Sequence, residues 1–170
     1  KDIKSLLKNL KALEVETGNE EVAKEIWCVE QIYKVIELYL NVFRLLTEKK
    51  FEIAWRELER TDIELGFLKQ HFDNYTNSST LNFIENKIFN IQKLFPYKYF
   101  GSRETIIKKS HCSICKATHS LRNSCGHRVG EIYNGEMCFR VIEDFEIKGI
   151  ALVEDPFDKY AVLFPIGYEY

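Results

Sequence analysis

Proline and glycine, the two residues that interrupt helices, are scarce in the first hundred positions of this 170-residue chain. All three prolines lie at or beyond position 96, and only two of the eight glycines, Gly18 and Gly66, precede position 101. The interior of an α-helix excludes proline and disfavours glycine. Residues 1–95 are therefore predicted to be helical, and residues 101–170 to be rich in turns.

The chain also lacks a long apolar run and a strong net charge. No stretch approaches the roughly 18 uncharged residues that a membrane-spanning helix needs, so we expect neither an integral membrane protein nor a membrane partner. The formal net charge of −2 excludes a uniformly basic protein that coats nucleic acid, but it is compatible with local basic patches.

Cysteine is nearly absent from the helical part. Only Cys28 occurs there, within an apolar stripe, and it is expected to be a small core residue. The other four cysteines lie between positions 112 and 138. The odd total of five cysteines and the tight clustering of four of them favour a reducing compartment and a bound metal over disulfides. We therefore expect a cytoplasmic protein.

Apolar residues in the first 95 positions repeat with the period of an α-helix. This periodicity predicts four helices, over residues 2–13, 19–46, 51–72 and 81–95. The long second helix carries two adjacent apolar stripes, which is typical of a central helix with several neighbours. The break before the third helix is short, so the second and third helices should pack as an antiparallel hairpin.

Within the third helix, the stretch Phe51-x-x-Ala54-Trp55-x-x-Leu58 resembles the second helix of a tetratricopeptide repeat. No second copy follows at the expected period, and fewer than three such repeats rarely form a stable array. A plain helical bundle is therefore the better prediction for this half of the chain.

These patterns predict an α+β protein in three parts. Residues 1–95 form a helical scaffold, and residues 96–102 form an aromatic connector packed against it. Residues 103–170 form a small antiparallel β domain stabilised by zinc.

A strong turn signal organises the predicted sheet. Asn134-Gly135 is typical of a two-residue hairpin turn. Strands over residues 147–153 and 160–164 should extend this hairpin into one sheet, with aromatic side chains such as Phe145 in its core.

The most informative stretch contains four cysteines and a histidine between positions 112 and 138. Cys112 and Cys115 have the spacing of a zinc knuckle, in which a tight turn directs two thiolates at one ion. Structural zinc sites take four tetrahedral nitrogen or sulfur ligands, and Cys138 would return to the knuckle after the hairpin. The predicted Zn²⁺ ligands are therefore Cys112, Cys115, His127 and Cys138, with Cys125 as the alternative fourth ligand.

The choice between Cys125 and His127 rests on reach. The two residues flank one glycine, so in an extended segment both side chains can approach the metal. Imidazole reaches farther than a thiol, and Gly126 gives the chain freedom to swing it inward, which favours His127. In a second arrangement both residues bind, and Cys138 belongs to the core of the sheet.

Over residues 111–138 the pattern resembles small zinc-finger domains of the knuckle or ribbon kind, although a second Cys-x-x-Cys pair is missing. A catalytic zinc would keep one position open for water. The chain contains neither His-Glu-x-x-His nor the signature of nucleobase deaminases, so we expect no catalytic residue. A nuclease of the His-Asn-His type, with His127 as its base, is the third hypothesis, but no matching asparagine and histidine follow.

The segment around the cysteines is locally basic, with six basic residues and one acidic residue between positions 103 and 128. Basic side chains on a zinc finger can neutralise phosphates, so nucleic-acid binding is the leading alternative function. Its candidate residues are Lys108, Lys109, Lys116, Arg122 and Arg128. A basic segment that packs against the acidic end of the chain, or that lies beside zinc-bound thiolates, is the simpler explanation.

We therefore expect a non-enzymatic interaction or adaptor protein, in which zinc holds a recognition surface and the partner is another protein. Such a protein should expose an apolar patch or groove on its helices. The sequence leaves its oligomeric state open.

Overall fold

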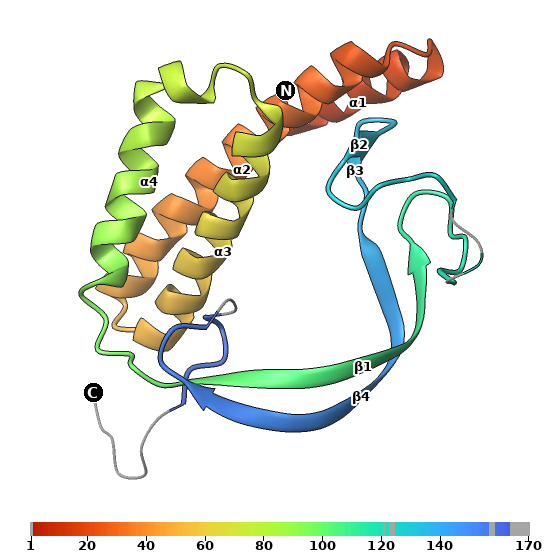
Figure 1. Cartoon of the computed structure of the whole chain (residues 1–170). Helices are drawn as coiled ribbons and strands as arrows, with labels where there is room; N and C mark the ends of the chain where they lie inside the picture. Colours follow the sequence, from red (N-terminus) through yellow and green to blue (C-terminus); the bar gives the residue numbers. More distant parts are fainter. Residues whose placement is uncertain (1, 121, 123–124, 157–158, 164–170) are drawn as a thin grey trace.

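The computed structural model describes residues 2–120, 122, 125–156 and 159–163. The helices are α1 (Ile3–Glu16), α2 (Glu20–Thr47), α3 (Phe51–His71), the short 3-10 helix η1 (Tyr75–Asn77) and α4 (Ser79–Gln92). The strands are β1 (Phe100–Cys112), β2 (Ile132–Tyr133), β3 (Glu136–Met137) and β4 (Arg140–Val153). All the helices precede the strands in the described ranges (Figure 1), so the prediction of an α+β fold is confirmed. No described helix combines the length and the apolar character that crossing a membrane requires.

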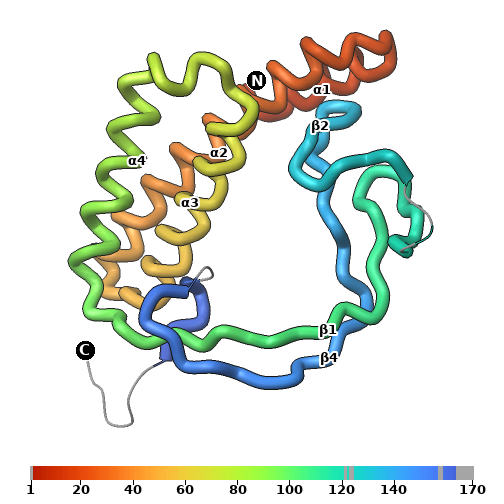
Figure 2. The backbone as a smooth tube through the Cα atoms, viewed as in Figure 1, coloured from red at the N-terminus to blue at the C-terminus, as the bar shows by residue number. Residues whose placement is uncertain are grey.

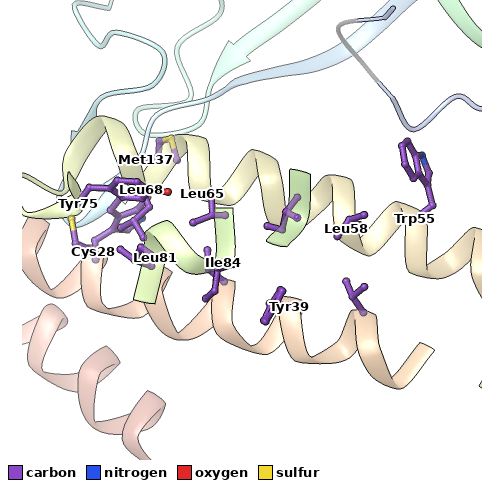
Figure 3. Close-up of a cluster of buried hydrophobic side chains, with 14 of the residues drawn as sticks. Cys28, Tyr39, Trp55, Leu58, Leu65, Leu68, Tyr75, Leu81, Ile84 and Met137 are labelled. Carbon is purple, nitrogen blue, oxygen red and sulfur yellow. The ribbon is translucent and has the colours of Figure 1, made fainter. Parts of the chain in front are cut away.

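Helices α2, α3 and α4 pack around one apolar core. The chain turns from α2 into α3 at Lys49, whose φ of 58° lies in the left-handed region that often ends a helix. Figure 3 shows the core side chains extending along the helices, from Trp55 at one end to Tyr75 and Cys28 at the other. Cys28 is a buried core residue, as predicted.

Strands β1 and β4 form one long antiparallel ribbon. The pairing runs from Phe100 opposite Val153 to Cys112 opposite Arg140, with three irregularities in the register. Nearly every residue between the two ends is exposed to solvent, because no described segment packs over either face. The strand β4 begins well before the predicted start at position 147.

The prediction of one continuous sheet is wrong. The pair β2–β3 and the ribbon β1–β4 are separate two-stranded sheets in the described part of the chain. Within the predicted strand 160–164, Val162 forms only an isolated bridge with Phe100, and Phe164 lies outside the described residues. Phe145, expected in a sheet core, is 52% exposed because the ribbon has no second layer.

The hairpin β2–β3 turns at Asn134 and Gly135, as this dipeptide predicts. Their φ angles are 51° and 64°, the left-handed conformation that both central residues of a type I′ turn adopt. The hairpin lies against the first two helices. The amide of Asn134 donates a 2.9 Å hydrogen bond to Glu20, and Lys11 pairs with Glu136 at 3.0 Å.

The β part is attached to the helical core at both ends of that core (Figure 1 and Figure 2). At one end the ring of Phe100 lies against Trp55, with centroids 6.3 Å apart. At the other end Met137 of β3 is only 5% exposed and belongs to the same core cluster. At this end too, Nε2 of His71 donates a 2.6 Å hydrogen bond to the carbonyl of Gly130. The chain thus leaves the helices at one end of their core and returns at the other.

Part of the predicted connector, residues 96–102, packs at the first attachment. The rings of Tyr97 and Phe95 meet Trp55 edge-on, with centroids 5.0 Å and 5.1 Å from the Trp55 ring. Strand β1 already begins at Phe100, so the second half of this segment is strand.

Truncation of Met137 should weaken the second attachment. Met137→Ala is expected to lower the free energy of unfolding by about 2–5 kcal/mol, because it leaves a cavity where the hairpin meets the helices. Urea unfolding followed by circular dichroism measures this change. Leu94→Ala removes a side chain that is 81% exposed, and it should change the stability by less than about 0.5 kcal/mol. Equal effects of the two substitutions would contradict the role given to Met137.

Candidate metal centre

Two turns bring four metal-ligating side chains together beyond the end of β1. The ligand atoms of Cys112, Cys115, Cys125 and His127 all lie within 4.8 Å of one another. Three sulfurs and one imidazole at this spacing can hold a metal ion. The cluster is compatible with a zinc-finger segment.

The first turn prepares Cys112 to act as a ligand. The backbone amides of Cys115 and Ile114 donate hydrogen bonds to its sulfur, and they lower the pKa of the Cys112 thiol to about 6. The amide of Lys116 closes the turn with a 3.0 Å hydrogen bond to the Cys112 carbonyl, and Lys116 takes a left-handed φ of 61°. Because the thiolate is the form that binds metals, these amides favour the binding state of Cys112.

The second turn is formed by Cys125, Gly126 and His127. Gly126 has a φ of 81°, a conformation that favours glycine, and the amide of His127 donates to the Cys125 sulfur. This hydrogen bond lowers the pKa of the Cys125 thiol, but burial and the thiols of Cys115 and Cys112 raise it by more, so the pKa lies above its usual value. Several thiols around one point resist losing all their protons unless a cation neutralises them.

His127 is braced by an aromatic ring and has one unsatisfied nitrogen. Its imidazole packs edge-on against Tyr133 of β2, with centroids 4.6 Å apart. The Tyr133 hydroxyl in turn accepts a 3.1 Å hydrogen bond from the amide of Arg128. The Nδ1 atom of His127 is buried without a hydrogen-bond partner. Burial of a polar atom without a partner costs free energy. A metal ion bound to this nitrogen would satisfy its lone pair.

Cys138, one of the ligands predicted from spacing, lies beside the four-residue group. Its sulfur is 3.7 Å from the Cys112 sulfur, and its side chain is buried. Burial raises the pKa of the Cys138 thiol to about 11, in the opposite direction from the pKa of Cys112. The structure therefore gathers both Cys125 and His127 with the knuckle cysteines and places Cys138 next to them as a fourth thiol.

Residues that the sequence analysis did not single out hold the first turn in place. The Ser113 amide donates a 2.9 Å hydrogen bond to the Phe139 carbonyl, and the Phe139 amide donates a 2.8 Å bond to Ser113 Oγ. The Gly130 amide donates to the Cys138 carbonyl at 2.9 Å. These contacts join segments far apart in the chain, and they leave no recognisable spacing in the sequence.

Three of the basic residues predicted for nucleic-acid binding lie in the loops around the cluster. The Lys116 ammonium donates a 2.7 Å hydrogen bond to the Ser113 carbonyl, so this side chain folds back over its own turn. Arg122 and Arg128 are exposed.

No protein-family model, no curated protein and no solved structure matches this chain. The function of the cluster therefore has to follow from its residues and their geometry.

Single substitutions should distinguish the two ligand sets. Cys125→Ser and His127→Ala should each lower the bound metal well below one equivalent, whereas Cys138→Ser should retain it. Elemental analysis of the purified variants at equal protein concentration measures this. Loss of metal in Cys138→Ser, with retention in Cys125→Ser, would instead support the set predicted from spacing.

Proposed function

We propose that this chain is a non-enzymatic interaction protein in which a structural Zn²⁺ holds the β part together. Thiolate and imidazole are the ligands of four-coordinate structural zinc sites, and Cys112, Cys115, Cys125 and His127 supply that donor set. Four protein ligands leave no open position for the water or substrate that a catalytic zinc needs. Free thiols persist in a reducing compartment, which supports a location in the cytoplasm.

Zinc would supply a cross-link that the small β part otherwise lacks. Strands β2 and β3 contain two residues each. The described residues between β1 and β2 contain no helix and no strand longer than a single bridge. Segments this short bury too little apolar surface to hold their loops, so a bound ion takes the place of a core, as in other small zinc domains.

The orientation of helix α1 carries the proposal of protein binding. Ile3, Leu6, Leu10 and Leu13 follow one another at helical spacing, yet these four side chains are 43–58% exposed. α1 has no buried residue among those described. A helix on the surface of a monomer normally turns such a stripe toward the core. An apolar stripe that faces outward is typical of a surface that receives another protein.

Ion pairs, together with the partly buried Leu7 and Val15, attach α1 to the rest of the molecule. The Lys11 ammonium lies 2.6 Å from Glu30 and 3.0 Å from Glu136, and Lys4 pairs with Glu37. Burial alone would lower the pKa of Lys11, but hydrogen bonds to Glu30 and Glu136 raise it above its usual value. Lys11 therefore stays charged and keeps its two ion pairs. The four residues of the apolar stripe take no part in these contacts, so the stripe remains available to a partner.

Nucleic-acid binding is less well supported by the charges of the ribbon. Lys108 pairs with Glu146 at 3.1 Å, and Lys109 pairs with Glu143. The acidic residues of β4 thus neutralise these basic residues of β1. Phosphates would have to displace carboxylates before they gained the contacts that drive nucleic-acid binding.

Removal of the metal should disorder the loops of the cluster and spare the helices. A chelator should release about one equivalent of zinc, because the four ligand atoms surround one point. Amide hydrogen exchange should then accelerate in residues 112–138 and stay slow in the core of α2 and α3, which does not include the ion. Protein purified without metal, with exchange that does not respond to the chelator, would exclude a structural zinc.

Photo-crosslinking in producing cells tests the α1 surface. A benzoylphenylalanine introduced at Leu10 should form an adduct with a defined protein, and the same residue at Asn90, exposed on α4, should not. The adduct should disappear when Leu6 and Leu13 are both replaced by serine, because the stripe then loses its apolar contacts. An absent adduct at Leu10, or the same adducts at both positions, would refute binding through α1.

A further inference from the structure

The apolar side chains of the β1–β4 ribbon gather on one of its faces. Residues paired across an antiparallel ladder share a face, and successive residues alternate between faces. The register assigns six pairs to this face: Gly101–Leu152, Arg103–Ile150, Thr105–Ile147, Ile107–Phe145, Ser110–Ile142 and Cys112–Arg140. We call the large apolar residues of these pairs the ribbon's apolar face; they are Ile107, Ile142, Phe145, Ile147, Ile150 and Leu152.

Irregularities in the register keep these residues together. The apolar residues of β4 recur at alternating spacings of three and two positions, at Ile142, Phe145, Ile147, Ile150 and Leu152. In a regular strand, two residues three positions apart lie on opposite faces. The register shifts leave Lys148, Lys108 and Glu143 as extra residues outside the pairing. A bulge of this kind absorbs one residue and restores the phase of the strand. All three extra residues are charged.

The other face of the ribbon carries mainly polar and charged residues, together with the exposed Ile106 and Val141. Glu146 lies on it, opposite Ile106, and forms ion pairs with Lys108 at 3.1 Å and with Lys148. The ribbon is therefore amphipathic. Such a pattern is expected for a sheet with one face covered and the other in water.

No described residue covers the apolar face. Its six large side chains are 37–67% exposed. A two-stranded sheet is only marginally stable by itself and normally packs an apolar face against another layer. The face therefore has the character of one half of an interface.

We propose that a second copy of this chain covers the apolar face, so that two ribbons pack face to face about a two-fold axis. Two sheets pack in this way through interdigitating apolar side chains, about 10 Å apart. The apolar face is roughly 30 Å long and 10 Å wide, so two faces span about 600 Å² in projection. The accessible area of their side chains is larger, and two copies together bury on the order of 1,000 Å², near the lower limit of specific interfaces. Interfaces of this size are typical of weak, reversible association.

Charge also permits this pairing. Among the described residues that the register assigns to the face, two are charged: Arg103 lies near one end, and Arg140, paired with Cys112, lies at the other end and donates a 2.8 Å hydrogen bond to Ser110. A two-fold axis through the centre of the face, close to Ile147, leaves the arginines of both copies at the rim of the interface, where their long side chains can extend into water. The dimer uses neither α1 nor the metal ligands, so it does not depend on the proposed function.

Sedimentation equilibrium of the zinc-loaded chain, from low micromolar to several hundred micromolar protein, tests the dimer. Ile147→Lys should raise the dissociation constant at least about tenfold, because it places a charge at the centre of the interface. Ile106→Lys is the matched control, since Ile106 is 49% exposed and Ile147 is 47% exposed on opposite faces of the same ribbon. This control should leave the dissociation constant unchanged, as should Leu10→Glu on α1.

A second measurement does not depend on the folding of the lysine variants. A benzoylphenylalanine in place of Phe145 should yield covalent dimers of the chain on illumination, and one in place of Ile106 should not. A chain that stays monomeric throughout, or equal effects of the two lysine substitutions, would overturn the proposal. A dimer that Leu10→Glu abolishes and Ile147→Lys leaves intact would assign self-association to α1 and would also overturn it.

Discussion

Attachment of the β part at both ends of one helical core is the constraint on which the rest of the structure depends. A two-stranded ribbon has no core of its own, so its position is set by the contacts at its ends. Phe100 against Trp55 fixes the first end. Beyond the second end, Met137 enters the core and His71 holds the carbonyl of Gly130. The long exposed section between these attachments can exist because neither end is free.

The candidate metal-binding cluster lies directly beside the second attachment, and the two share residues. Gly130 accepts a hydrogen bond from His71 and donates one to the carbonyl of Cys138. Tyr133 belongs to the docked hairpin and braces the ring of His127. Order in the ligand loops and docking of the hairpin therefore stabilise each other. A change in either one should therefore affect the other, although none of the four candidate ligands belongs to the buried core cluster.

Most of the helical half follows from the sequence, and much of the ribbon does not. The helical periodicity of apolar residues is strong in α2 to α4, and the Asn134-Gly135 pair specifies its turn without help from tertiary contacts. Strand β1 mixes charged and small residues between its ends, and the bulges of β4 break the alternation by which strands are recognised. The ribbon is formed by a partner strand some forty residues away, which local patterns do not reveal.

In the candidate site, too, the sequence predicts one part and not the other. Two-residue spacing identifies Cys112 and Cys115, because a single tight turn determines how their side chains converge. The choice among Cys125, His127 and Cys138 depends on where a second turn and a hairpin lie relative to the first. That arrangement is set by contacts such as those of Ser113 and Tyr133, and spacing carries no information about it.

The bulged pairing of β1 with β4 also bears on the order of events as the chain is synthesised. Ser102 pairs with Ala151 and Cys112 with Arg140, so β1 is complete long before its partner exists. The loop to be closed is shortest at the Cys112 end, and closure costs the least entropy there. The candidate ligands Cys115, Cys125 and His127 come directly after Cys112 in the chain. A metal ion bound there would shorten the loop between Cys112 and Arg140 further. The ribbon is therefore expected to pair progressively from the cluster toward Phe100, after the helices have been synthesised.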